Sequence, residues 1–169
     1  MAPLHGQRVV LRQLVEDDRA EIGRILDDPT VARWWGPGDV ALRLAEWFDD
    51  DDETERFAIE LDGRVVGTVQ FHEENEPDYR HAGLDIFLDG AHQGQGIGVD
   101  ALRTLARYLV EVRGHHRLTI DPSAANEHAI RAYARVGFRP VGVMRRYERG
   151  SDGTFHDGLL MDMLADELT

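Results

Sequence analysis

The stretch DIFLDGAHQGQGIGVDALRTL, residues 85–105, decides the fold because it joins three kinds of segment without a break. The apolar run at residues 86–88 predicts the end of a buried strand. A glycine-rich loop follows, and leucine residues at helical spacing then predict a helix over residues 96–112. A loop that opens a helix presents free backbone N–H groups and the positive end of the helix dipole. This order therefore predicts a phosphate-binding loop.

Two familiar phosphate loops do not match these residues. A P-loop requires a lysine after its last glycine, and this chain contains no lysine at all. A Rossmann loop requires three glycines in the pattern G-x-G-x-x-G. Gly94 and Gly96 fit the first two positions, but Val99 occupies the third. A Rossmann loop also lies early in its βαβ unit, whereas some ninety residues precede this one.

The composition excludes several kinds of chemistry. The chain has 169 residues and no cysteine, and all 19 of its basic residues are arginine. Thiol nucleophiles, disulfides and lysine Schiff bases are therefore excluded. Ser123 and Ser151 are the only serines, and neither lies in a G-x-S-x-G motif. The length predicts one domain over residues 1–169.

The net charge of −13 argues against a nucleic-acid partner, because phosphate binding needs clustered basic residues. The same charge favours a cationic partner through electrostatic steering, although solubility alone also explains it. The acidic run at residues 49–55 reads as a solvated turn. No apolar segment is long enough to span a membrane and no signal peptide is evident, so we expect a cytoplasmic protein without a membrane partner.

The rest of the chain predicts a mixed α/β (α+β) order rather than strict alternation. Before the glycine loop we expect a strand at residues 8–14, helices at 15–28 and 39–50, a hairpin at 56–72 around Asp62-Gly63, and a strand at 81–89. After it we expect a strand at residues 115–121, a helix at 126–138, and two strands joined around Asp152-Gly153.

The glycine loop, read from Gln93 to Gly98, resembles the acyl-CoA pyrophosphate loop of the GNAT superfamily, Q/R-x-x-G-x-G/A. The segment NEHAIRAYARVGFRPVG, residues 126–142, resembles that family's second cofactor segment. The resemblance is clear over residues 83–142. It implies the GNAT fold, a central, mostly antiparallel, twisted sheet that is splayed at the acyl-CoA site and flanked by helices. It implies acetyl-CoA contacts at Ile86, Phe87, Leu88, Gln93, Gly94, Gln95, Gly96, Ile97, Gly98, Asn126, Ala129 and Tyr133.

In such an enzyme the acceptor amine attacks the thioester directly in a ternary complex, so the protein needs no nucleophile. The resemblance implies that the backbone N–H near Leu88 polarises the thioester carbonyl and that Tyr133 is the general acid for the leaving thiolate. The alternative for Tyr133 is an aromatic residue that packs in the core.

Three further features resemble the aminoglycoside 6'-N-acetyltransferases, whose substrates are cationic amines. They are VARWWGP with Trp34 and Trp35, GLDIFL with Asp85, and the Asp-Pro-Ser segment that begins at Asp121. Asp152 matches a further substrate carboxylate more loosely. The resemblance implies that these residues bind the amine, with Asp85 acting as a base or only as an anchor. Core packing for the tryptophans and a turn at Asp121 are the structural alternatives.

Other functions stay open. The tail GTFHDGLLMDML, residues 153–164, is also similar to N-terminal acetyltransferases of ribosomal proteins or peptides. Siderophore-type lysine N-acyltransferases share several of the motifs, and His72 and His81 keep that reading open. A non-catalytic acyl-CoA sensor would need the glycine loop alone. No H-x-x-x-H pattern occurs, so we predict no metal. The sequence decides neither the physiological role, antibiotic resistance included, nor between monomer and homodimer.

Overall fold

The computed structural model describes residues 1–35, 39–49 and 53–169. Its strands are β1 (Leu4–His5), β2 (Val9–Gln13), β3 (Thr54–Leu61), β4 (Arg64–Glu74), β5 (His81–Leu88), β6 (Arg117–Ile120), β7 (Arg139–Arg149) and β8 (Phe155–Leu164). Its α-helices are α1 (Arg19–Asp27), α2 (Pro29–Ala32), α3 (Val40–Trp47), α4 (Ile97–Glu111) and α5 (Glu127–Ala134). None of the described helices is both long and apolar enough to cross a membrane.

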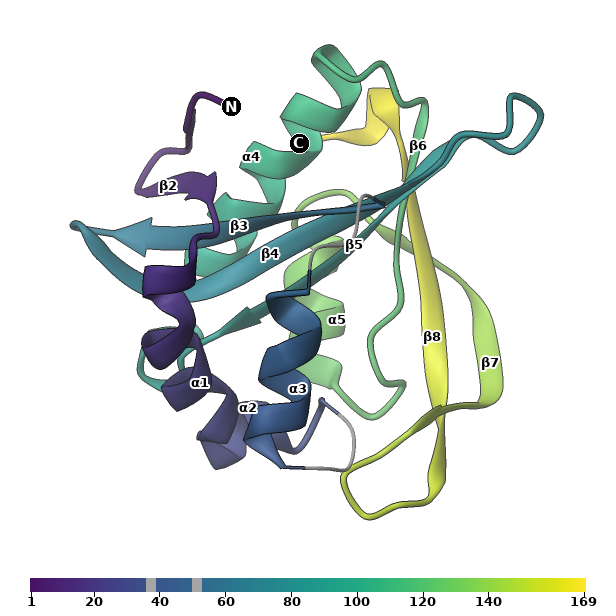
Figure 1. The fold of residues 1–169 in the computed structure, drawn as a ribbon. Coiled ribbons are helices and arrows are strands. Elements are labelled where there is room, and N and C mark those ends of the chain that lie inside the picture. The colour runs from purple at the N-terminus through teal and green to yellow at the C-terminus, as the bar shows by residue number, and fades with distance from the viewer. Residues whose placement is uncertain (36–38, 50–52) are drawn as a thin grey trace.

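The strands form one sheet in the order β1-β2-β3-β4-β5-β6-β8-β7. All neighbours are antiparallel except β5 and β6, which run parallel. These two strands pair only at Ala82 with Leu118 and at Gly83 with Thr119. Beyond Gly83, no strand in the described part of the chain pairs with this edge of β5. The sheet therefore opens at its centre, and β6 and β8 turn away from the first five strands (Figure 1).

Helices cover both faces of the sheet. Figure 1 shows α1, α2 and α3 on one face, with α4 and α5 on the other. The larger apolar core lies between the sheet and α4, which buries Leu102, Leu105 and Leu109 completely. A second cluster packs α1, α2 and α3 against Phe87 of β5. Each helix is held by one apolar face, as the spacing of its leucine, isoleucine and valine residues predicts.

The predicted fold class is confirmed, with differences at element ends. The pair β1–β2 was not predicted, because β1 is only two residues long and has no pattern of its own. The first helix begins at Arg19 rather than at residue 15, because the Asp18 carboxylate accepts the Val15 N–H and holds a 3₁₀ turn at Glu16–Asp18. The last helix ends at Ala134, ahead of the predicted residue 138.

Two predicted features fall partly outside the described residues. Gly36 and Pro37, which follow the tryptophan pair, lie outside the residues that the structure describes. So does the middle of the acidic run, residues 50–52.

Asp100, on the first turn of α4, fastens the N-terminal segment to this helix. Its side chain is 7% exposed, and its carboxylate accepts the backbone N–H groups of Gln7 at 3.0 Å, Arg8 at 2.8 Å and Val9 at 3.1 Å. A carboxylate that accepts several backbone N–H groups makes strong, charge-assisted bonds. The helix that follows the glycine loop is therefore tied to the first strands of the sheet.

A second buried polar cluster joins the far end of β4 to the segment after α4. Glu73 accepts hydrogen bonds from Arg113 and, at 2.6 Å, from the buried ring of His115. Burial alone would raise the pKa of Glu73, but the His115 and Arg113 bonds outweigh it and hold that pKa below its ordinary value of 4.5.

Candidate active site

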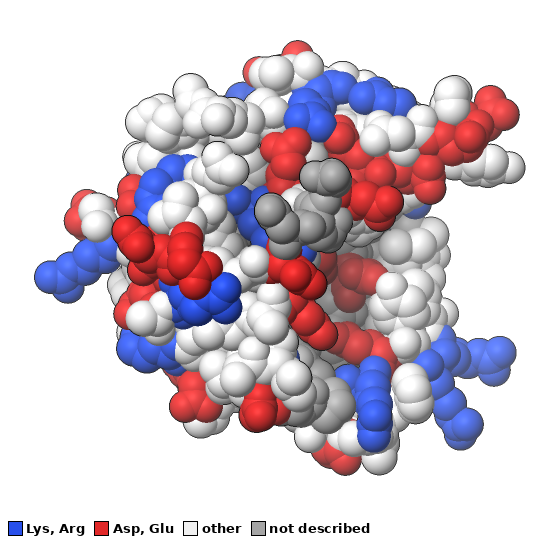
Figure 2. Space-filling model, in the orientation of Figure 1, with Lys and Arg blue, Asp and Glu red and all other residues white. Residues whose placement is uncertain are grey.

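A cavity of about 1080 Å³ opens where β5 and β6 separate. Such a volume lies at the upper end of typical ligand pockets. Most of the residues predicted to form the site lie on its walls: Trp34, Trp35, Asp85, Ile86, Phe87, Leu88, Gln93, Gly94, Gly96, Gly98, Asp121, Asn126, Ala129 and Tyr133. On the face that Figure 2 shows, acidic side chains border a hollow in the surface.

The glycine loop forms one end of this cavity. Gly94 and Gly96 have φ values of 73° and 80°, in the left-handed region that glycine adopts without strain. Gly98 lies on the first turn of α4, where an added Cβ would come within 3.1 Å of Leu88. The first N–H groups of a helix have no intrahelical partner, so the start of α4 offers donors and a positive dipole end to an anion.

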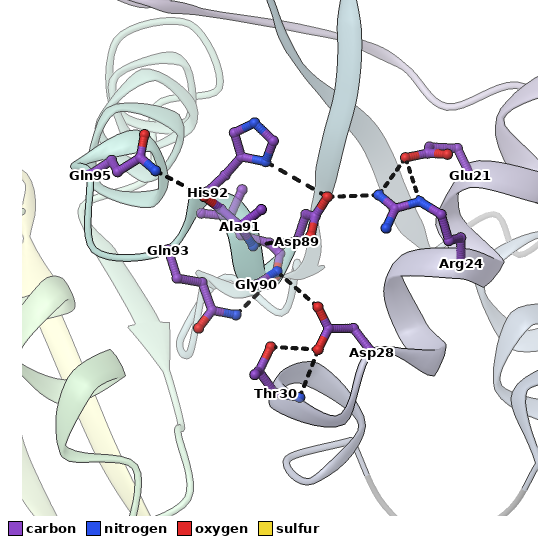
Figure 3. Close-up of polar contacts among 11 residues, drawn as sticks. Glu21, Arg24, Asp28, Thr30, Asp89, Gly90, Ala91, His92, Gln93 and Gln95 are labelled. Atoms are coloured by element: carbon purple, nitrogen blue, oxygen red, sulfur yellow. Dashed lines mark hydrogen bonds and ion pairs between the residues drawn. The ribbon is translucent and has the colours of Figure 1, made fainter.

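The loop is held from outside by two aspartates (Figure 3). Asp89 pairs with Arg24 of α1 at 2.7 Å, and Asp28 accepts the Gly90 N–H at 3.3 Å. Burial raises the pKa of Asp89, but the bond and charge of Arg24, together with the Ala91 N–H, outweigh it and hold that pKa below the ordinary value. These contacts place the entrance of the loop against α1 and α2.

The side chains of the two loop glutamines bond to the loop itself. Gln93 donates from Nε2 to the Leu88 carbonyl at 3.0 Å, and Gln95 donates to the Ala91 carbonyl at 2.9 Å (Figure 3). Both residues were predicted to contact the cofactor. In this structure their side chains shape the loop, which leaves its backbone N–H groups as the available donors.

The open edge of β5 carries unpaired backbone groups toward the cavity. Asp89 donates its N–H across to Val66 of β4, at 2.8 Å. Because backbone groups alternate in direction along an antiparallel strand, the N–H groups of Ile86 and Leu88 point to the other side, where β6 has turned away. The predicted splay at residues 86–88 is thus present in the structure.

Asp85 lies on the same strand and is half-buried at the cavity wall. Its Oδ2 accepts a hydrogen bond from Gln70 Nε2 on β4, at 3.1 Å. Burial raises the pKa of the Asp85 carboxyl; Asp121 adds to this rise, whereas the Gln70 bond and His72 oppose it. The net rise brings this carboxyl closer to the range of a useful base.

Sequence reasoning missed the contribution of β7. Its pairing with β8 shifts register between Met144 and Glu148, and Arg146 has a φ of 49°. Such a bulge re-aims the side chains beside it. Here Tyr147 and Glu148 line the cavity, and Tyr147 donates to Asp121 at 2.6 Å. The irregular run of arginine and valine in this strand gave no periodic signal for a bulge.

Four carboxylates line this cavity: Asp85, Asp121, Glu127 and Glu148. Glu127 is exposed and pairs with Arg131, so Asp85, Asp121 and Glu148 are the three that act on one another. Burial raises the pKa of Glu148, and the negative charges of Asp121 and Asp85 raise it further. The hydrogen bond to Asp121 raises the pKa of Tyr147 to about 12. Like charges gathered in this way disfavour one another until a cation enters among them.

Tyr133 of α5 lies between the core and the cavity. It is 9% exposed and lines the cavity, so the structure contains features of both predicted alternatives. Burial raises the pKa of its hydroxyl well above the usual range, and the charges of Asp85 and Asp121 add to the rise. This hydroxyl therefore keeps its proton, which it can donate to a neighbouring group. Asn126 caps the start of the same helix, because its side-chain oxygen accepts the Ala129 N–H at 3.1 Å.

The tryptophan pair serves both packing and the cavity. Trp35 packs edge-on against Trp47 and Phe87, with ring centroids 5.6 Å and 5.2 Å away. Trp34 carries the guanidinium of Arg33 over its ring at 4.5 Å. Both tryptophans line the cavity, so at least part of each ring system is available to a ligand.

Three predicted site residues do not line the cavity. The Gln95 side chain is exposed on the loop, and Ile97 is completely buried in the core because it begins the apolar face of α4. Asp152 lies in the exposed turn between β7 and β8, where its carboxylate is committed to Thr154 and His156. The prediction that Asp152 joins the substrate site is therefore not supported. His72 lines the cavity, whereas His81 does not.

Comparisons with known proteins agree with this geometry. The model of the acetyltransferase (GNAT) family matches residues 19–138. The chain belongs to this family, as its glycine loop predicted. Aminoglycoside N(6')-acetyltransferase type 1 of Klebsiella pneumoniae is 27% identical in an alignment 155 residues long. The alignment covers 80% of this chain and 76% of that protein.

Solved structures share the fold across nearly the whole chain. RimJ of Mycobacterium smegmatis, in complex with CoA-disulfide, has a TM-score of 0.83 at 26% identity. The superposition covers 99% of this chain and 88% of the RimJ chain. AAC(6')-Ib, in complex with ribostamycin and coenzyme A, has a TM-score of 0.79 at 24% identity and covers 95% of this chain and 96% of its own.

Proposed function

We propose that this GNAT acetyltransferase moves the acetyl group of acetyl-CoA to a primary amine of a cationic small molecule, with the 6'-amine of an aminoglycoside as the leading candidate. The observation that carries the proposal is the set of carboxylates of Asp85, Asp121 and Glu148 around one cavity, with an anion-binding loop at its other end. Acetyl-CoA supplies an activated thioester. The chain supplies the binding sites, the hydrogen-bond donors and the proton transfers.

The residues present suit the cofactor. The pyrophosphate requires an anion site, and the backbone at Gly94 and Gly96, before α4, and at Gly98, on its first turn, can provide one. The pantetheine arm is an extended amide chain, and the unpaired edge of β5 can pair with it as a neighbouring strand would. The N–H of Leu88 then lies on the side where it can donate to the thioester carbonyl.

The acceptor amine arrives as an ammonium and must lose a proton before its nitrogen can form the new C–N bond. Asp85 is the group that receives this proton or holds the ammonium while water removes it. The free amine then attacks the thioester carbonyl, and as the C–S bond breaks the Tyr133 hydroxyl donates its proton to the departing sulfur. The nitrogen of the new amide loses its second proton, which restores the proton of Tyr133 directly or through water. Asp121 and Glu148 attract further positive charges of the substrate, and aromatic faces such as Trp34 suit sugar rings and cations.

The relatives support a polycationic substrate. The K. pneumoniae relative is named for aminoglycoside 6'-acetylation, and the AAC(6')-Ib structure contains ribostamycin beside coenzyme A. A second candidate is the N-terminal amine of a peptide, which the similarity of residues 153–164 favours. A peptide would present a single ammonium at its N-terminus, whereas this cavity offers the carboxylates of Asp85, Asp121 and Glu148 together.

The test is thiol release from acetyl-CoA, with a kanamycin-type aminoglycoside, a polyamine and an N-terminal peptide in parallel. The chain has no cysteine, so it contributes no background to thiol reagents. We expect release with the aminoglycoside, a loss of about 10²-fold or more in kcat for Tyr133→Phe, and retained cofactor binding. Asp85→Asn should impair amine turnover far more than acetyl-CoA binding.

The exposed Tyr79 and Asp78 provide matched controls, because Tyr79→Phe and Asp78→Asn make the same chemical changes away from the cavity. Thiol release with the peptide alone would contradict a small-molecule substrate and indicate N-terminal acetylation of peptides instead. Binding of acetyl-CoA without release for any amine would instead identify a sensor.

A further inference from the structure

Three side chains form a polar row across the sheet behind the cavity. Arg56 of β3 lies opposite Gln70 of β4, and Gln70 lies opposite Asp85 of β5. Residues opposite one another on neighbouring strands project from the same face, so the three side chains meet in sequence. Arg56 Nε donates to Gln70 Oε1 at 3.2 Å, and Gln70 Nε2 donates to Asp85 Oδ2 at 3.1 Å.

The row has a fixed direction. Arginine has only donors, so the oxygen of the Gln70 amide must face Arg56. The amide nitrogen must then face Asp85, because the two ends of the amide cannot both be the same atom type. Arg56 is itself anchored through Nη1 to the Asp49 carbonyl at 3.1 Å. A glutamine without this partner could turn its oxygen toward the carboxylate and repel it.

Gln70 also lines a separate cavity of about 150 Å³, together with Arg56, Trp35 and Arg43. Its partner Asp85 lines the large cavity, so the hydrogen bond from Gln70 reaches the wall of that cavity. Both Arg56 and Gln70 are half-buried, so the bonds between them are partly shielded from water. Shielded hydrogen bonds to a charged group are stronger than exposed ones.

Several polar groups face Asp85 from the elements around it. Asp121, after β6, raises the pKa of Asp85, whereas the Gln70 amide and His72 on β4 oppose the rise. The charge of Asp85 in turn raises the pKa values of Tyr133 on α5 and of Tyr147 and Glu148 on β7. Among the hydrogen bonds of the described residues, the one from Gln70 is the direct contact to this carboxylate. It occupies Oδ2, which leaves Oδ1 as the oxygen for a ligand.

We propose that Gln70 and Arg56 are positioning residues for the acetyl-transfer reaction, which hold the Asp85 side chain in one orientation, as a carboxylate, with Oδ1 directed to the acceptor amine. This inference rests on the proposed function for the role of the amine. The hydrogen-bonded row itself does not, because it is a property of the ligand-free chain. Neither residue touches a substrate; each acts through its neighbour.

The test combines a pH profile with a titration that needs no turnover. Gln70→Leu removes the amide and keeps a side chain of similar volume. The control variant Gln7→Leu makes the same change at an exposed residue that is distant in the sequence. The loss of one hydrogen bond to a charged group should shift the acidic limb of kcat/KM for the amine upward by about one pH unit. The carboxyl ¹³C resonance of Asp85, assigned by its loss in Asp85→Asn, should move its midpoint in the same direction. Gln7→Leu should change neither.

A second pair of variants keeps Gln70 in place. Arg56→Met frees the amide to turn and should give a smaller shift in the same direction, whereas Arg56→Lys, which retains a donor, should restore the profile. If Gln70→Leu fails to fold, the contrast between Arg56→Met and Arg56→Lys decides the question. An unchanged Asp85 midpoint in Gln70→Leu and Arg56→Met would overturn the inference, whatever the turnover. A shifted midpoint in a chain that acetylates no amine would refute the proposed function and leave the row as described.

Discussion

Replacement of Asp100 tests how the helix after the glycine loop is fixed to the rest of the sheet. Its carboxylate accepts three backbone N–H groups, from Gln7, Arg8 and Val9. In Asp100→Ala, the N–H groups of Gln7 and Arg8 can turn to water, because both residues are exposed. Val9 is 1% exposed, so its N–H stays buried and unpaired, which costs about 1–3 kcal/mol.

Adding the weaker loss of the two hydrated bonds gives an expected decrease of about 3 kcal/mol in the free energy of unfolding for Asp100→Ala. Asp100→Asn should cost about 1 kcal/mol, because its amide oxygen can still accept from Arg8 and Val9. Its NH₂ group then faces Gln7, which is exposed and can rehydrate. The two substitutions therefore separate the hydrogen bonds from the volume of the side chain.

Urea denaturation, followed by circular dichroism, measures both effects. Asp78→Ala, which removes a carboxylate from an exposed loop, should stay within about 0.5 kcal/mol of the parent chain. If Asp100→Ala loses no more stability than Asp78→Ala, the carboxylate does not anchor the N-terminal segment and the reasoning is wrong. If Asp100→Asn costs as much as Asp100→Ala, the negative charge matters more than the geometry of the bonds.

Two further predictions concern the cavity and the polar cluster at Glu73. Tyr147→Phe removes the hydrogen bond to Asp121. We expect the KM for the amine to rise about fivefold at nearly constant kcat, which corresponds to a loss of about 1 kcal/mol in binding free energy. The control Tyr79→Phe should leave the steady-state kinetics unchanged. The pKa of Glu73 is lower in the folded chain than its ordinary value of about 4.5 in the unfolded chain. Its contribution to the free energy of unfolding is therefore full above pH 4.5 and is lost as the pH falls through the folded-state pKa. The stability gap between the parent chain and Glu73→Gln should therefore narrow between pH 7 and pH 3; a constant gap in urea titrations would contradict this assignment.

The sequence predicts those parts of the fold that have a local pattern. Leu102, Leu105 and Leu109 recur at helical spacing, and the structure buries all three on one face of α4. The turns around Asp62-Gly63 and Asp152-Gly153 connect strands as predicted, because positive backbone angles select glycine at those positions. Local patterns of this kind survive in the folded chain because tertiary packing uses the same faces.

The features that the sequence did not predict depend on contacts between distant segments. The short strand β1 exists because it pairs with β2, and no pattern in two residues indicates that. Tyr147 enters the site through a bulge whose position depends on the partner strand β8. The family resemblance implied a substrate contact for Asp152, but in the structure its carboxylate bonds within its own turn.

The parting of β5 from β6 also decides where the unpaired strand edges of this sheet lie. An unpaired strand edge is a template for another chain, and proteins usually protect such edges. Here the unpaired edge of β5 faces an internal cavity that side chains of α2 and α5 help to wall. The two outer edges of the sheet are β1, which is only two residues long, and β7, whose bulge and arginine residues, among them Arg145 and Arg146, hinder regular pairing. The fold thus places the free backbone donors of β5 along a cavity, where an extended ligand rather than another strand can pair with them.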